Sequence, residues 1–122
     1  MREILFRGKG DKKYNDGGWY YGAPIQCNDG DWQICTNCSK RTVVAKTIGQ
    51  YTGLTDNNGT KIFEGDILKA NNGHIGWVIF RNGEFVKRCC CHPNSFNIFY
   101  GDNETVVGNI YDNPELLRGD IE

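Results

Sequence analysis

Asn-Gly dipeptides recur at short intervals through the middle of this chain, at Asn58-Gly59, Asn72-Gly73 and Asn82-Gly83. Both residue types tolerate positive φ angles, so the pair is typical of two-residue turns between neighbouring antiparallel strands. The segments between these turns are short and alternate apolar with polar residues. The pattern therefore predicts a β-meander that curls into a small barrel or a tight sandwich.

Glycine content supports an all-β fold. The chain has 122 residues, of which 16 are glycine and 3 are proline. Glycine destabilises long helices and serves tight turns, so this balance favours many short strands. A chain of this length suits a single domain, or two small lobes that share one core.

The N-terminal third predicts a hairpin followed by less regular structure. Residues 3–8 read as a first strand, residues 15–18 (Asn-Asp-Gly-Gly) as a turn, and residues 19–22 as the return strand. We expect the aromatic side chains of residues 19–21 to pack in the core rather than to form an exposed binding face. Short strands are then predicted at residues 32–35 and 42–48.

The densest signal is the stretch from residue 51 to residue 68. Turn residues dominate it, and we expect Asp56 to Gly59 and Glu64 to Asp66 to be turns that hydrogen-bond their own backbone. Four apolar residues of this stretch are expected to anchor the entry into the barrel: Leu54, Ile62, Phe63 and Ile67. The stretch therefore predicts a structural signature and not a reaction centre.

The C-terminal half continues the meander. Residues 74–80 are apolar at both alternating sets of positions, which predicts a central strand. Further strands are predicted at residues 84–87, 96–100 and 105–111. Asn113 and Pro114 begin a short helix, and we expect its Leu116 and Leu117 to close one end of the barrel.

Five blocks of this sequence, in this order, resemble the YopX-like family, whose members are small proteins of bacteriophages and prophages. The blocks are residues 1–8 (MREILFRG), 19–22 (WYYG), 48–56 (IGQYTGLTD), 59–68 (GTKIFEGDIL) and 108–117 (GNIYDNPELL). They span nearly the whole chain. The resemblance implies a phage, prophage or mobile-element origin.

The resemblance also implies how the fold is divided. It implies an all-β protein with an N-terminal β portion, residues 1–48, that carries a cysteine-containing irregular insert. Residues 49–122 would form an SH3-like barrel, and the two portions would make one compact unit. The family supplies no catalytic positions to carry over, and its pattern does not extend to the cysteine-rich segments.

The six cysteines raise the question of a metal. Cys35 and Cys38 form a Cys-x-x-Cys turn, and zinc would take two further ligands from Cys89 or Cys91 together with His92. Such a closed site would be structural and would leave Cys27 and Cys90 free. Against it stand the long separation between the two segments and the opposite directions of adjacent residues on a strand. Unligated thiols are the simpler alternative.

No catalytic constellation is evident. A Cys–His pair with His74 or His92 as the base exists only as residue types, because nothing in the sequence supplies a third, orienting group. Neither a phosphate-binding loop nor a dinucleotide fingerprint is present. We therefore expect no catalytic and no cofactor-binding residues, and a binding or assembly module rather than an enzyme. The alternative is a zinc-binding or thiol-dependent protein.

Charge favours a protein partner or self-association over nucleic acid. The formal net charge is −1, and no polybasic run is present. A nucleic-acid surface would need six basic side chains to converge on one face: Lys9, Lys12, Lys13, Lys40, Arg41 and Lys46. With no membrane-length apolar run and no signal peptide, we expect a protein of the bacterial cytoplasm.

Overall fold

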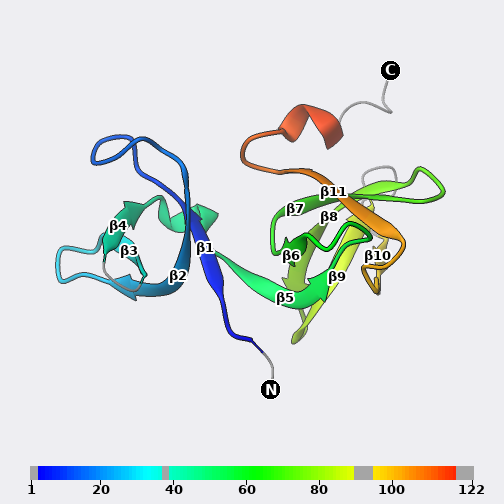
Figure 1. Ribbon diagram of the computed structural model, residues 1–122, viewed down its shortest axis with the longest axis horizontal. Helices are drawn as coiled ribbons and strands as arrows, with labels where there is room; N and C mark the ends of the chain where they lie inside the picture. The colour runs from blue at the N-terminus through cyan, green and yellow to red at the C-terminus, as the bar shows by residue number, and fades with distance from the viewer. Residues whose placement is uncertain (1–2, 37–38, 90–94, 118–122) are drawn as a thin grey trace. The chain divides into compact units, whose positions relative to one another are not determined.

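The computed structural model describes residues 3–36, 39–89 and 95–117. Its regular structure consists of eleven strands and two short 3-10 turns, so the all-β prediction is confirmed (Figure 1). The chain divides into two units, Met1–Tyr51 and Thr52–Glu122. None of the described segments forms a helix long and apolar enough to cross a membrane.

The first unit is a curled antiparallel sheet. Its strands are β1 (Phe6–Lys9), β2 (Trp19–Gln26), β3 (Trp32–Cys35), β4 (Lys40–Val43) and the start of β5 (Gly49–Thr55), in the order β4-β3-β2-β1-β5. A bridge between Gly10 and Val43 also brings β4 against the end of β1. The curled sheet encloses a small core, in which Ile34 and Val43 are buried.

The segment after β4 differs from its prediction. Residues 42–48 were expected to be one strand, whereas β4 ends at Val43 and Ala45–Thr47 form the 3-10 turn η1. The Thr47 hydroxyl donates to the Val44 carbonyl at 2.6 Å and accepts from the Lys9 backbone N–H at 2.8 Å. This local hydrogen bonding competes with a strand, and it ties the turn to β1.

The expectation that the aromatic residues of β2 pack in the core is wrong. Trp19 and Tyr20 are half-buried, and Tyr21 is exposed. The Arg7 guanidinium lies 4.6 Å from the centre of the Trp19 ring, and the Arg41 guanidinium lies 5.7 Å from that of Tyr20. Among the described residues of this unit, the buried hydrophobic side chains are Ile34, Val43 and Tyr51. The β2 rings are therefore not part of its core, and two of them pack against arginines.

The second unit is built on an open five-stranded sheet. After β6 (Lys61–Phe63) come β7 (Asp66–Ala70), β8 (Ile75–Arg81), β9 (Glu84–Cys89), β10 (Phe96–Asn97) and β11 (Glu104–Asn109). The antiparallel order is β10-β9-β8-β7-β11, and β6 pairs with β5 instead. Ile62, Leu68, Val78 and Phe99 form its core. Of the predicted anchors, Ile62, Phe63 and Ile67 are buried and Leu54 is partly buried.

The expected barrel is not closed in the described part of the chain. Strands β10 and β11 are the two edges of the sheet. The loop between β5 and β6 reaches β11 without forming a strand ladder: the Asn57 N–H donates to the Glu104 carbonyl, and the Val106 N–H donates to Asp56 Oδ2. A register shift between Val106 and Gly108 interrupts the pairing of β11 with β7.

One of the three Asn-Gly turns has the predicted two-residue geometry. Asn82 and Gly83 have φ angles of 53° and 82°, and Arg81 pairs with Glu84 across them. At the other two sites only the glycine has a positive φ. At those two sites the glycine N–H donates to the backbone carbonyl three residues earlier, that of Asp56 or Ala70. This hydrogen bond closes a loop longer than two residues.

The remaining elements are shorter or less buried than predicted. Strand β8 is central, as predicted, but only Gly76 and Val78 along it are buried, and Phe80 is exposed. Strand β10 covers two of the five residues predicted for it. The C-terminal helix is the 3-10 turn η2 (Pro114–Leu117). Its two leucines are half-buried, so they do not fill a barrel end.

Candidate functional site

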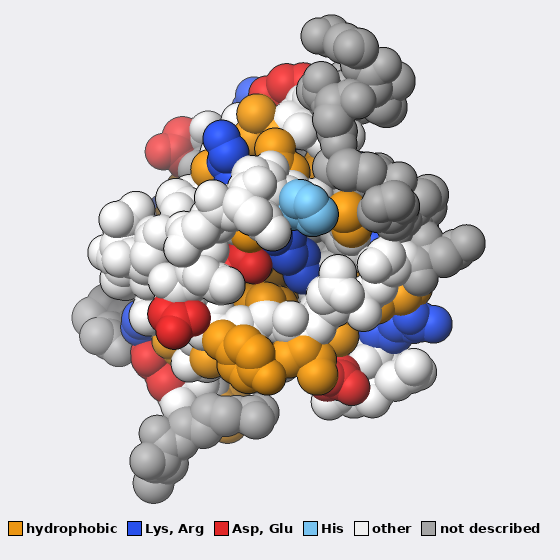
Figure 2. Space-filling model, turned by 90° about the vertical axis from the view of Figure 1, so that its right-hand side faces the viewer, with side chains coloured by type: hydrophobic (Ala, Val, Ile, Leu, Met, Phe, Trp, Pro, Cys, Tyr) orange, Lys and Arg blue, Asp and Glu red, His pale blue; other side chains and the backbone are white. Residues whose placement is uncertain are grey.

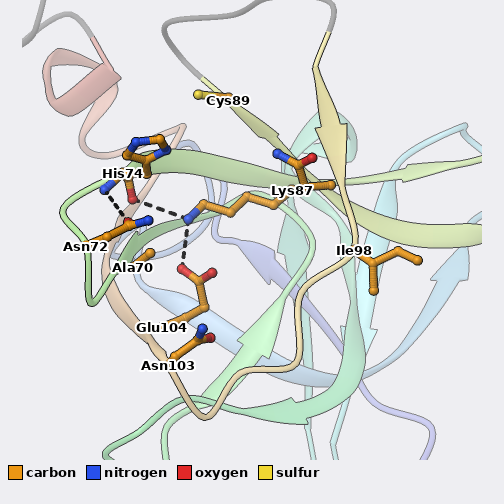
Figure 3. A pocket seen from close by; sticks show the side chains of 9 residues that line it. Ala70, Asn72, His74, Lys87, Cys89, Ile98, Asn103 and Glu104 are labelled. Carbon is orange, nitrogen blue, oxygen red and sulfur yellow. Dashed lines mark hydrogen bonds and ion pairs between the residues drawn. The ribbon is translucent and has the colours of Figure 1, made fainter.

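A pocket of about 190 Å³ opens at one end of the five-stranded sheet of the second unit. Nine residues line it: Ala70, Asn72, His74, Lys87, Cys89, Asn97, Ile98, Asn103 and Glu104. Figure 3 shows that these residues come from several strands and turns, with the Lys87 and Glu104 side chains pointing toward one another. On the surface the pocket is a hollow with acidic, basic and histidine side chains, and hydrophobic side chains gather beside it (Figure 2).

Strand register explains why two charged side chains reach this pocket. Lys87 pairs with Val78, and Glu104 pairs with Ala70. Residues paired across antiparallel strands point to the same face of the sheet, and residues two apart on one strand share a face. Lys87 therefore shares its face with the core residue Val78, and Glu104 shares its face with Leu68.

Lys87 and Glu104 form a buried ion pair at the floor of the pocket. Lys87 Nζ lies 2.8 Å from Glu104 Oε1, and the two side chains are 8% and 7% exposed. Lys87 Nζ also donates to the His74 carbonyl at 3.3 Å. The lysine thus links β9 to β11 and to the turn between β7 and β8 (Figure 3).

The pocket retains hydrogen-bonding capacity beyond this pair. Lysine carries three N–H donors, and two of them are used. Among the described residues, neither Glu104 Oε2 nor the side-chain amide of Asn103 has a hydrogen-bond partner. The volume is far above the roughly 10–15 Å³ that one water molecule needs. A ligand with both donors and acceptors would find partners here.

Two exposed apolar residues lie on one segment, and we call them the apolar rim: Ile98, which lines the pocket, and Tyr100, two residues further along the chain. They are 64% and 73% exposed, whereas Phe99 between them is buried in the core. Ile98 itself lines the pocket (Figure 3). Anchoring of Phe99 therefore presents its two neighbours to solvent.

The predicted zinc ligands are only partly within the described residues. Cys35 is half-buried on β3 of the first unit, and Cys89 is buried on β9 of the second. Cys38, Cys91 and His92 lie outside the described residues. Within the described residues, no three His, Cys, Asp or Glu side chains are close enough to hold a metal ion. The zinc site stays a prediction.

The structure places one of the two Cys–His combinations in the same pocket. His74 and Cys89 both line it, yet no hydrogen bond joins the imidazole and the thiol in the described part of the chain.

Sequence reasoning missed Lys87 and Glu104. A signal for the lysine was present, because Phe85, Lys87 and Cys89 share one face of a strand, which makes Lys87 the charged member of an otherwise inward-facing set.

The six basic residues named above do not all share one face. Lys40 and Arg41 are consecutive on β4, so their side chains point to opposite sides of the sheet. Arg41 is directed toward Tyr20, and Lys9 on β1 is half-buried. This arrangement disperses positive charge over the first unit.

The acidic turn residues bind their own backbone, as predicted. Asp66 Oδ2 accepts from the Phe63 N–H at 2.7 Å, and Asp66 is buried. Asp56 Oδ1 accepts from the N–H groups of Asn58 and Thr60, at 2.8 and 2.9 Å. The carboxylates of Asp56 and Asp66 therefore serve to hold the backbone of their own turns.

The match to a family model decides what kind of protein carries this pocket. The model described as "YopX protein" matches residues 6–118, nearly the whole chain. The chain belongs to the YopX family. The resemblance drawn from the five sequence blocks is thereby confirmed, and the match extends across both units of this YopX-family protein.

A solved structure shows the same fold. The crystal structure of protein EF1440 from Enterococcus faecalis is 20% identical to this YopX-family chain, with a TM-score of 0.63. The match covers 96% of this chain and 99% of that one. At this level of identity the likeness concerns the fold alone. No curated protein matches the chain.

Proposed function

We propose that this YopX-family protein is a noncatalytic binding module that recognises another protein through the pocket and its apolar rim. One observation carries the proposal: Ile98 lines a polar pocket with a buried ion pair at its floor, and both Ile98 and Tyr100, two residues further along the chain, are largely exposed. Exposed apolar side chains next to a concave site with a few fixed polar groups are characteristic of recognition surfaces.

Charge supports a protein over a nucleic acid as the partner. Residues 62–122, which include the pocket, contain five basic and nine acidic residues. Phosphate backbones bind surfaces with an excess of lysine and arginine. The second unit has the opposite balance, and an aromatic residue with an aliphatic neighbour suits a protein interface.

The arrangement of the pocket supports a noncatalytic role. Cys89 is its one thiol among the described residues, it is buried, and it makes no hydrogen bond with His74. A nucleophile needs a base within hydrogen-bond reach and a group that orients that base.

Family membership supports a phage or prophage origin, and with it a site of action in the bacterial cytoplasm.

Affinity purification tests the proposal. The tagged protein and the double variant Ile98→Ser/Tyr100→Ser are each used to retain proteins from the bacterial host, with and without phage or prophage induction. Tyr14→Ser is the matched control, because Tyr14 is 64% exposed in the other unit. We expect at least one protein to be retained by the wild type and by the control but lost with the double variant.

One result of the affinity purification would contradict the proposed binding surface. Retention of the same proteins by all three forms would show that the rim is not the binding surface. The partner can also be a second copy of the chain. In that case light scattering should show a mass that rises with concentration for the wild type and stays monomeric for the rim variant.

A further inference from the structure

We infer that the pocket binds a side-chain carboxamide, from an asparagine or glutamine of the partner, while flanking apolar residues of the same segment cover Ile98 and Tyr100. This inference rests on the proposed function and adds to it the chemistry of the anchoring residue. Its basis is the hydrogen-bonding and charge character of the pocket lining.

Net charge at the pocket floor argues for a neutral anchor. Lys87 and Glu104 are paired at 2.8 Å and offset each other's charge. A carboxylate entering the pocket would approach Lys87 but would be repelled by Glu104. An ammonium or guanidinium would approach Glu104 but would be repelled by Lys87. Either ion would lose its hydration without gaining an unpaired counter-charge.

The unused hydrogen-bonding groups argue for an anchor that both donates and accepts. Glu104 Oε2 is an acceptor, and Lys87 Nζ has one N–H beyond the two bonded to Glu104 and the His74 carbonyl. A carboxamide has two N–H donors and one carbonyl acceptor on a single plane. Its NH₂ group matches the carboxylate oxygen, and its carbonyl matches the ammonium.

The remaining lining is compatible with the same ligand. Asn103 is exposed at the pocket mouth, and its side-chain amide can donate to or accept from the carboxamide of the partner. Asn72 and Asn97 also line the pocket, but Asn72 Oδ1 accepts from the His74 N–H and Asn97 Nδ2 donates to Ser95 Oγ. An apolar anchor, by contrast, would displace water from the charged groups and leave them without replacement hydrogen bonds.

The position of the apolar rim explains how one segment of the partner would reach both the pocket and the rim. Ile98 is both a lining residue and part of the apolar rim, and Tyr100 follows two residues later. A segment with an amide side chain in the pocket would therefore place its neighbouring residues over Ile98. The recognition element is a carboxamide flanked by apolar side chains.

A peptide-display selection tests the inference. A random peptide library is selected against the folded full-length protein, and the recovered peptides are sequenced and remade. We expect a shared Gln or Asn next to apolar residues. Replacing that residue with Glu, Lys or Leu in a remade peptide should weaken binding about tenfold or more, the effect of losing one or two buried hydrogen bonds.

Protein variants test whether the pocket is responsible. Asn103→Leu should weaken the selected peptides about tenfold, because it places an apolar side chain at the pocket mouth without altering the buried pair. Asn58→Leu is the matched control, an exposed asparagine in the β5–β6 loop. Amide NMR spectra of both variants confirm that the fold is retained.

Two outcomes would overturn the inference. One is a selected motif with an acidic or basic anchor, or with no polar anchor. The other is equal affinity of the Asn103→Leu and Asn58→Leu variants. If such peptides still lose binding to Ile98→Ser/Tyr100→Ser, the proposed binding function stands and only the carboxamide anchor is rejected. If no peptide depends on rim or pocket, both fail.

Discussion

Asp56 shows how a single carboxylate organises the most distinctive stretch of this sequence. Its side chain is buried, and it accepts three backbone hydrogen bonds, from Asn58, Thr60 and Val106. Burial raises the pKa of Asp56, but these hydrogen bonds to its charged form outweigh burial and hold the pKa below its ordinary value. The aspartate closes its own loop and fastens that loop to β11.

Substitution of Asp56 should therefore destabilise the second unit. We expect Asp56→Ala to lower the free energy of unfolding by about 1–3 kcal/mol, because three partly buried backbone N–H groups lose their acceptor. Asp102→Ala is the control, since Asp102 is exposed in a nearby turn. Urea unfolding measures both variants. Equal stability of the two would contradict the structural role of Asp56.

Acid should remove the same contribution. Because the folded-state pKa of Asp56 lies below the unfolded value, its stabilising effect is fully present above the unfolded pKa, about 3.8. The effect is lost as pH falls through the lower, folded pKa. The difference in unfolding free energy between wild type and Asp56→Asn should therefore shrink below about pH 4. A difference that is constant from pH 7 to pH 2 would be inconsistent with this linkage.

The cysteines allow a third prediction at the residue scale. We expect unligated thiols, and therefore less than about a tenth of an equivalent of zinc in protein purified without added metal. A structural site would give about one equivalent, which Cys35→Ser would abolish, as would Cys89→Ser where Cys89 rather than Cys91 is the ligand. Elemental analysis of the three proteins distinguishes the two outcomes.

At the scale of elements, the Lys87–Glu104 pair joins β9 to β11, which are not neighbours in the sheet. We expect Lys87→Met alone to destabilise the protein by about 3–5 kcal/mol, because Glu104 would stay buried without its partner. The double variant Lys87→Met/Glu104→Leu should recover most of that loss. A double-mutant cycle by urea unfolding measures this. Additive effects of the two substitutions would contradict a coupled pair.

Sequence patterns predicted most strands but not what lies on their surfaces. Alternation and Asn-Gly turns located β7, β8 and β9, because their signals are local. The aromatic residues of β2 were misplaced, since their burial depends on how small the core of the first unit is. The pocket was missed because its two charged residues are 17 positions apart and meet only through strand register.

At the scale of the whole molecule, each unit has its own fold and its own surface character. The first unit is a curled sheet around Ile34 and Val43, with arginines against its aromatic rings. The second holds a larger core, the buried ion pair and the apolar rim. Family membership covers both units, whereas the pocket belongs to the second alone. We therefore place the proposed binding surface in the second unit.

The affinity of the purified partner for three forms of the protein tests this account most directly. The dissociation constant is measured by calorimetry for the wild type, for Ile98→Ser/Tyr100→Ser and for Tyr14→Ser. We predict at least about tenfold weaker binding for the rim variant, given the apolar area that two exposed side chains can bury, and no change for Tyr14→Ser. Equal dissociation constants for the wild type and the rim variant would contradict the account.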